Sequence, residues 1–182
     1  MRLAHAWLAL QAVTSREVAK FLRQGGRLAS ALVRPLLWLV VFAAGFQNVF
    51  GVSIIPPYDT YIPYQTYIVP GLLGMVLLFN GMQSSLAMVY DREMGLMRLL
   101  LTAPLPRAWL LFCKLCATAL LSVLQALAFV LVALLLGTGL PLLTLDALHA
   151  LVALLAGALM LGALGLLLSV HIKQLENFAG TM

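Results

Sequence analysis

Four long apolar stretches constrain this chain more than any other feature of its sequence. They cover residues 35–55, 67–90, 109–136 and 145–170. A helix rises about 1.5 Å per residue, so about 20 apolar residues cross the hydrocarbon core of a bilayer. Of the 182 residues, 63% are hydrophobic and only 9% are charged, whereas soluble domains carry about 25% charged residues. We therefore predict an all-α integral membrane protein with four transmembrane helices.

The positive charges alternate between the two sides of these spans. Six Lys or Arg residues precede the first span, three follow the second, Lys114 lies just inside the third, and Lys173 follows the fourth. The loops after the first and third spans carry no cation, and their acidic residues are Asp59 and Asp146. All eleven cations thus fall on one side, which the positive-inside rule makes cytoplasmic. We expect a cytoplasmic N-terminus and a cytoplasmic tail at 171–182.

Residues 1–30 predict a further helix, amphipathic and lying in the membrane surface. On a helical wheel its basic residues share one face, opposite an apolar face that includes Trp7 and Phe21. Interfacial helices place such apolar side chains in the acyl boundary and their cations at anionic headgroups. The helix either anchors the chain or also supports a cytoplasmic partner, and its periodicity disfavours a signal peptide. The basic face consists of Arg16, Lys20, Arg23 and Arg27, preceded by Arg2 and His5.

Residues 91–107 form the predicted cytoplasmic connection between the second and third spans. Charged residues come first, an apolar stretch follows, and two prolines then stop a helix. We expect a short amphipathic helix here, with Leu96, Leu99 and Leu100 on one face. A plain connection needs only a few residues, so these leucines favour a docking surface for a cytoplasmic protein over a simple loop.

Several motifs follow one another in a definite order. They are Tyr67-Ile68-Val69-Pro70-Gly71-Leu72-Leu73, Asp91-Arg92-Glu93-Met94-Gly95, Leu99-Leu100 and Thr102-Ala103-Pro104-Leu105-Pro106-Arg107, with Lys114 in the third span. In this order, over nearly the whole chain, the sequence resembles the type-2 ABC transporter permeases of bacteria, which export polysaccharides, oligosaccharides and drugs. The resemblance implies one ABC-2 type transmembrane domain over residues 1–182, in the bacterial inner membrane.

The resemblance also implies a function and partners. Such a permease forms the path for export of a substrate, and a separate ABC ATPase subunit hydrolyses ATP to drive it. Residues 91–107 would be the coupling segment, residues 1–30 the connecting helix that touches the same ATPase, and two permease subunits would form a homodimer. The implied ATPase contacts are Asp91, Arg92, Glu93, Gly95, Arg98, Leu99, Leu100, Pro104 and Arg107.

Two features depart from the pattern of these permeases. Many members have Thr-x-Glu after the glycine of the second motif, whereas this chain has Leu96-Met97-Arg98 and lacks that acid. Members usually have six spans, and this chain ends after the fourth. We therefore expect a partial sequence that lacks two spans.

The sequence contains no motif that could supply energy for transport. A Gly-x-x-x-x-Gly-Lys-Ser/Thr phosphate loop does not occur. Lys114 and His149 lie near span ends, where we expect their side chains to reach the interface. Ion-coupled carriers have ionisable groups inside the membrane, so a partner must supply the energy here. The polar residues of the predicted span interiors are amides: Gln47, Asn48, Asn80, Gln83 and Gln125.

Cys113 and Cys116 form a C-x-x-C pattern, which in other settings serves redox or metal chemistry. Two ligands do not complete a tetrahedral zinc site, so we interpret them as small thiols on one helix face. We expect no metal, no cofactor and no catalytic residue. The formal charge of +5 collects at span ends, so we expect no nucleic-acid partner.

Small residues at helical spacing predict close packing of membrane helices. Packing within one subunit is favoured over a dimer seam or a translocation path. The residues are Gly74 and Gly81 in the second span, and the pairs Ala153, Gly157 and Ala158, Gly162 in the fourth.

Two functions of other classes remain as alternatives. A non-transport membrane assembly or scaffold protein needs no reactive groups, so composition is compatible with it. A membrane-embedded enzyme needs polar catalytic groups together at an interface, and the sequence shows no such cluster. Co-purification of an ATPase separates a permease from both.

Overall fold

The computed structural model describes residues 3–23, 25–46, 64–97, 102, 106–138 and 145–171. These residues form helices and turns and contain no β-strand, which confirms the predicted all-α class. The helices are α1 (Leu3–Arg23), α2 (Gly25–Phe46), α3 (Tyr64–Glu93), α5 (Arg107–Leu135) and α6 (Leu145–His171).

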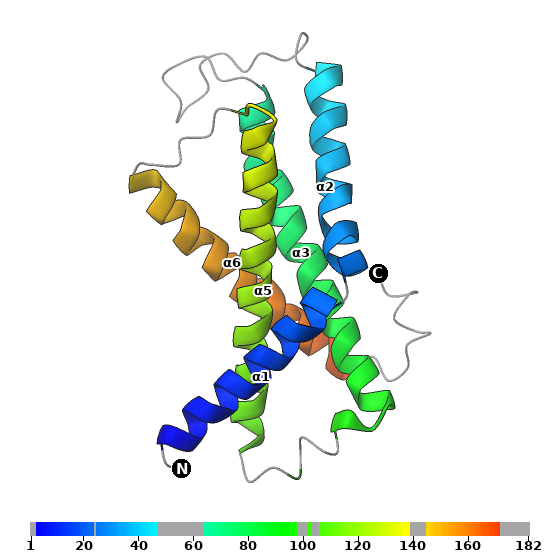
Figure 1. Cartoon of the computed structure of the whole chain (residues 1–182), viewed down its shortest axis with the longest axis vertical. Coiled ribbons are helices and arrows are strands. Elements are labelled where there is room, and N and C mark those ends of the chain that lie inside the picture. The colour runs from blue at the N-terminus through cyan, green and yellow to red at the C-terminus, as the bar shows by residue number, and fades with distance from the viewer. Residues whose placement is uncertain are drawn as a thin grey trace.

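The long helices make a bundle with one helix lying across it. Helices α3 and α5 stand side by side, α2 runs along α3, and α6 crosses both obliquely from behind (Figure 1). Helix α1 lies across the lower half of the bundle in this view and packs mainly on α5. This placement suits the predicted surface helix, because α1 runs across the spans rather than beside them.

Three of the four predicted spans coincide with helices long and apolar enough to cross a membrane. These parts are Thr66–Glu93, Arg107–Leu135 and Ala147–His171. The first predicted span is covered only as far as Phe46, where α2 ends, and the apolar part Leu32–Phe42 of that helix is shorter. Residues 47–55 lie outside the described residues, so the full first span stays a prediction.

The start of the first span differs from the prediction. We expected Pro35 at the first helical position, after an N-terminal helix reaching residue 30. Instead α1 ends at Arg23, α2 begins at Gly25, and Pro35 is a buried residue inside α2. Proline within a helix removes one backbone hydrogen bond, which membrane helices tolerate when neighbouring elements cover the site. Pro70 likewise lies inside α3.

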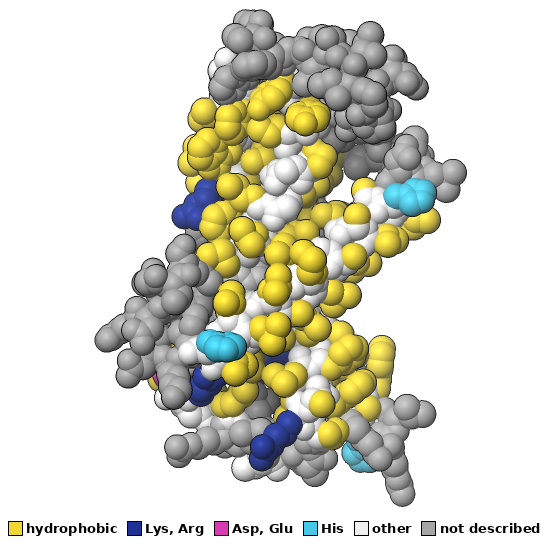
Figure 2. Space-filling view, turned by 180° about the vertical axis from the view of Figure 1, so that it is seen from behind, with side chains coloured by type: hydrophobic (Ala, Val, Ile, Leu, Met, Phe, Trp, Pro, Cys, Tyr) yellow, Lys and Arg dark blue, Asp and Glu magenta, His cyan; other side chains and the backbone are white. Residues whose placement is uncertain are grey.

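An apolar core joins α2, α3 and α5. Leu39, Val76 and Phe129 are almost fully buried there, together with Val69 and Ala133. The outer surface is apolar too: Figure 2 shows hydrophobic side chains over most of the described part of one face, with most of its cations in the lower half. Because only 17% of the apolar window of α6 is buried, its outer side suits contact with lipid rather than water.

Helix α5 ends as its glycine requires. Gly137 has φ +79, a conformation that residues with a Cβ rarely adopt. Its N–H donates to Leu134 O, and the N–H of Thr138 donates to Ala133 O, the bond pattern of a Schellman motif. Thr66 Oγ1 at the start of α3 donates to Thr138 O at 2.7 Å. The predicted break after the third span is therefore also a fixed link between α3 and α5.

A close crossing of α3 and α6 depends on glycine. A Cβ added to Gly165 would lie 2.6 Å from Gly81 O, and one added to Gly81 would lie 2.9 Å from Leu161 O. Gly157 and Gly162 also face side chains of neighbouring helices at short range. The prediction of packing within one subunit is confirmed for Gly81, Gly157 and Gly162. A Cβ at Gly74, the fourth predicted glycine, would meet nothing within 4 Å.

Candidate functional site

A buried carboxylate near the end of α3 holds three helices together. Asp91 is 2% exposed and accepts hydrogen bonds from three cations. Lys114 Nζ of α5 lies 2.8 Å from Asp91 Oδ2, Lys20 Nζ of α1 lies 3.2 Å from Oδ1, and Arg16 Nη2 of α1 lies 3.4 Å from Oδ2. We call these four residues the Asp91 cluster.

The burial of its members shows which contact dominates the Asp91 cluster. The side chain of Lys114 is 13% exposed, whereas those of Arg16 and Lys20 are 37% and 36% exposed. Coulombic attraction increases as the surrounding dielectric falls, so the inner pair of Asp91 and Lys114 is the strongest. A buried ion pair mainly fixes geometry, because desolvation offsets much of its attraction. The cluster thus sets the positions of α1 and α5 relative to the end of α3.

Arg92 extends the same end of α3 to a fourth helix. Arg92 Nη2 donates to Ser169 O in the last turn of α6 at 2.9 Å. The last carbonyl groups of a helix have no intrahelical donor, and a cation there also interacts favourably with the helix dipole. The end of α6 is therefore held against the end of α3 by a contact to its backbone.

Helix α1 does not divide its surroundings as the helical wheel suggested, with the whole apolar face in the acyl boundary and the whole basic face at the headgroups. Phe21 from the apolar face is 4% exposed and lies between α3 and α5, while Trp7 from the same face is 68% exposed. Arg16 and Lys20 from the basic face reach inward to Asp91. The border between the two faces packs on the bundle, and Trp109 Nε1 of α5 donates to Ala6 O beside it.

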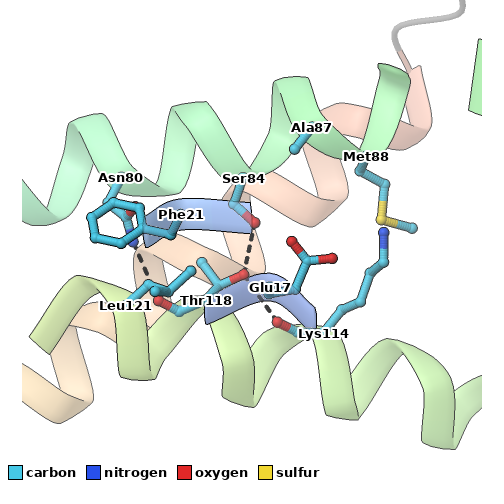
Figure 3. A pocket seen from close by; sticks show the side chains of 9 residues that line it. All are labelled: Glu17, Phe21, Asn80, Ser84, Ala87, Met88, Lys114, Thr118 and Leu121. Atoms are coloured by element: carbon cyan, nitrogen blue, oxygen red, sulfur yellow. Dashed lines mark hydrogen bonds between the residues drawn. The ribbon is translucent and has the colours of Figure 1, made fainter. Parts of the chain in front are cut away.

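A polar chamber of about 40 Å³ lies beneath α1, between α3 and α5. Figure 3 shows Phe21 and Glu17 of α1 reaching into it, opposite Ser84 and Thr118. The hydroxyls of Ser84 and Thr118 are 2.7 Å apart, and Asn80 Nδ2 donates to Thr118 O at 3.2 Å. Asn80 also donates to Ser122 Oγ. A volume of this size with several polar partners suits a few buried water molecules.

These polar groups form two facing stripes. Asn80 and Ser84 are four residues apart on α3, and Lys114, Thr118 and Ser122 continue at the same spacing on α5. Residues four apart share a helix face. Inside a membrane, polar side chains hydrogen-bond across helices, at about 0.6 kcal/mol per bond on average. The stripes therefore fix the rotation of α3 against α5 more than they strengthen the contact.

Comparison with known proteins identifies the family. The sequence pattern of the family described as ABC-2 type transporter matches residues 8–182. This chain belongs to the ABC-2 type transporter family. No solved structure matches it.

Curated relatives of this ABC-2 chain are named transport permeases. It is 34% identical to the transport permease ycf38 of Cyanophora paradoxa over 116 residues, which are 63% of this chain and 38% of that protein. It is 28% identical to the protein of the same name from Porphyra purpurea over 131 residues, 71% of this chain and 44% of the relative. The chain therefore spans less than half the length of these relatives.

The structure places several residues of the predicted coupling segment of this ABC-2 chain. Glu93 is exposed at the last position of α3, and Arg107 is exposed at the first position of α5. Gly95 has φ +72, and its N–H donates to Arg92 O at 3.1 Å. The prediction of direct ATPase contact does not suit Asp91, because its carboxylate is buried among cations of its own chain.

Other predicted residues of the coupling segment and the connecting helix lie outside the residues that the structure describes. These are Arg98, Leu99, Leu100 and Pro104, and for Arg27 the backbone in α2 is described but the side chain is not. Arg23 of the basic face is exposed at the end of α1. The contacts expected of these residues remain predictions.

Three features of the site differ from the prediction or were not part of it. Lys114 turns inward to Asp91 instead of reaching the interface. Glu17, which contacts Arg16 at 3.2 Å, was not among the predicted site residues. Thr118 and Ser122 follow Lys114 at intervals of four residues, a spacing from which a polar helix face could have been predicted.

The cysteines and the remaining amides add no reactive centre in the described part of the chain. Cys113 is buried, Cys116 is partly buried, and both are free thiols. The described residues contain no group of three or more potential metal ligands among His, Cys, Asp and Glu. Gln125 is fully buried on α5, and its amide atoms have no hydrogen-bond partner among the residues that the structure describes.

Proposed function

We propose that this chain is the permease subunit of an ATP-binding cassette transporter. It contributes to the path for export of a substrate across a bacterial inner membrane, with its N-terminus in the cytoplasm. ATP hydrolysis on a separate ATPase subunit drives the transport, and two permease subunits form a homodimer. The family membership supports a permease, and the Asp91 cluster is the observation that supports a role for residues 91–107 in coupling.

The Asp91 cluster supports coupling because of its position in the chain. Residues 91–93 are both the last turn of α3 and the beginning of the predicted coupling segment. A force on that segment reaches α1 and α5 through Asp91, and α6 through Arg92. Packed helices with discrete contacts move as bodies rather than deforming continuously. Motion of the segment would thus tilt these helices together.

The proposed role divides the predicted coupling residues into two groups. Glu93 and Arg107 have exposed side chains on either side of the connection and would contact the ATPase. Asp91 and Arg92 would transmit the motion inside the permease. Gly95 would set the direction in which the chain leaves α3, since its backbone at φ +72 disfavours any residue with a Cβ.

Co-purification tests the proposal most directly. The full chain, tagged and purified after cross-linking in its native membrane, should retain a protein with a nucleotide-binding cassette, identified by mass spectrometry. Recovery of the chain without any such ATPase would contradict the proposal and favour an assembly or scaffold role.

Substitution of Gly95 tests the coupling geometry. Gly95→Val should uncouple the permease from its ATPase, because the strained turn redirects residues 96–107. Permease-dependent ATP hydrolysis should fall at least ten-fold, while the chain still inserts and folds. Gly71→Val is the matched control, since a Cβ at Gly71 meets nothing within 4 Å and Gly71 lies at the other end of α3. Equal hydrolysis by both variants would show that the turn after α3 does not transmit force.

A further inference from the structure

A second cavity opens where α1 crosses the end of α3 and the start of α5. Its volume is about 250 Å³, and its walls are mostly apolar, including Val13, Met88 and Leu110. Three cations also line it: Arg16, Lys114 and Arg107. We call this cavity the cationic groove.

The charges around the cationic groove do not balance. Asp91 and Glu17 are the acids that pair with Arg16, Lys20 and Lys114. Arg107 adds a further cation, exposed and without an ion pair among the described residues. Four cations against two acids leave an excess of two positive charges beside an apolar cavity. That excess attracts an anion.

One buried donor and one uncapped helix start lie at the cationic groove. The Nε atom of Arg16 is buried, and it has no hydrogen-bond partner within the described part of the chain. The first turn of α5 has no side-chain cap, because Pro106 at the N-cap position makes no such bond. Uncapped N–H groups at a helix start favour an anion by hydrogen bonding and through the helix dipole. The buried Arg16 Nε without a partner is costly, whereas the first residues of α5 are exposed and add only a favourable dipole; an anionic group would satisfy the first and suit the second.

We infer that the cationic groove binds an anionic phospholipid of the surrounding leaflet. The phosphate lies at Arg16 and Arg107, and part of one acyl chain occupies the apolar cavity along Met88 and Leu110. Basic pockets between membrane helices on the cytoplasmic side bind lipid headgroups in this way. The cavity is smaller than the roughly 300–1,000 Å³ of sites for drug-sized ligands, so it accepts a segment of one chain and not a whole lipid.

The position of the cationic groove gives this lipid a structural role. Its walls come from α1, α3 and α5, the same helices that the Asp91 cluster joins. A phosphate beside Arg16 balances the charge that Asp91 leaves unpaired. The lipid therefore stabilises the contact of α1 with the bundle while the ATPase proposed above does not occupy Arg107.

Native mass spectrometry of the purified full chain in detergent tests the inference. Dioleoylphosphatidylglycerol should bind with higher affinity than dioleoylphosphatidylcholine. One cation near a membrane contributes about 1 kcal/mol to attraction of an anionic lipid, so Arg107→Gln should weaken phosphatidylglycerol binding about five-fold. Arg23→Gln is the matched control, because Arg23 is an exposed cation of α1 that does not line the groove. Equal binding of the two lipids, or equal losses in the two variants, would overturn the inference.

A second pair of variants tests the apolar part of the site. Val13→Phe narrows the groove and should weaken phosphatidylglycerol binding, whereas Ala12→Phe places the same ring at an exposed neighbouring position and should not. Burial of Cys113, measured with a thiol-reactive dye, verifies that each variant is folded. Inorganic phosphate in the millimolar range should not displace the lipid. Displacement, or unchanged binding by Val13→Phe, would show a simple anion site and contradict the acyl-chain assignment.

Discussion

Asp91 shows how much of this site depends on a single residue. One carboxylate, 2% exposed, has three cationic partners from two helices. Each cation can be lost while the others still balance the carboxylate, but loss of the carboxylate leaves all three beside one another. Removing one member of a buried pair costs far more than the pair itself contributes, because the remaining charge stays desolvated.

Asp91→Asn should therefore destabilise the protein by about 3 kcal/mol, the lower end of the range for broken buried ion pairs, because Arg16 and Lys20 are partly exposed. Lys114→Met should cost less, since two cations remain at Asp91, and Lys20→Gln should cost least. Thermal unfolding followed by the reactivity of Cys113, which is fully buried, ranks the variants. If Lys114→Met proved as damaging as Asp91→Asn, the shared carboxylate would not be the centre of the cluster.

At this scale the sequence allowed only part of the site to be predicted. The residues of the ion pair could be named, because Asp91 and Lys114 belong to recognisable motifs. Their pairing could not, because 23 residues separate them and nothing local fixes which face of α5 meets α3. The stripe of Thr118 and Ser122 was readable from its spacing, whereas the close approach at Gly165 needed the crossing angle of two helices.

At the scale of elements, the apolar runs predicted the helices well. The starts and ends of α3, α5 and α6 lie within a few residues of the predicted spans, since a bilayer demands a continuous apolar length. The N-terminal region was predicted less well. Pro35 suggested a helix start, but tertiary packing of Leu39 against α3 keeps α2 helical on both sides of it.

Glycine-to-alanine substitution should change the stability of the bundle in opposite directions at the crossing of α3 and α6 and away from it. Gly165→Ala should destabilise the bundle by about 1–3 kcal/mol, because the new Cβ overpacks against Gly81 O. Gly74→Ala should be neutral or stabilising by up to about 1 kcal/mol, because its Cβ enters open space and alanine favours the helix. The same thiol assay measures both. Equal effects would mean that the two helices do not touch at Gly165.

At the scale of the whole molecule, the distribution of charge predicts the orientation in the membrane. The cations of the Asp91 cluster and Arg107 gather at one end of the bundle, and the turn after α5 lies at the other (Figure 1). The periodicity of α1 identified its faces correctly, but it could not specify which face the bundle would cover, because that depends on the shape of α3 and α5.

Single cysteines test this orientation. In a Cys113→Ala, Cys116→Ala background, Leu136→Cys at the 52% exposed end of α5 should react with an impermeant maleimide in intact cells. Arg23→Cys at the exposed end of α1 should react only after permeabilisation. The reverse pattern would place residues 91–107 outside the cell and would exclude coupling to an ATPase in the cytoplasm.

The bond from Arg92 to Ser169 has a consequence for evolution. It ends on a main-chain oxygen, as does the bond from Trp109 to Ala6, so neither bond requires a particular side chain at the receiving position. Natural variation at positions 169 and 6 should then be statistically independent of positions 92 and 109. Positions 91 and 114, joined side chain to side chain, should instead vary together. Two of the connections that assemble this bundle would thus leave no trace in covariation between positions.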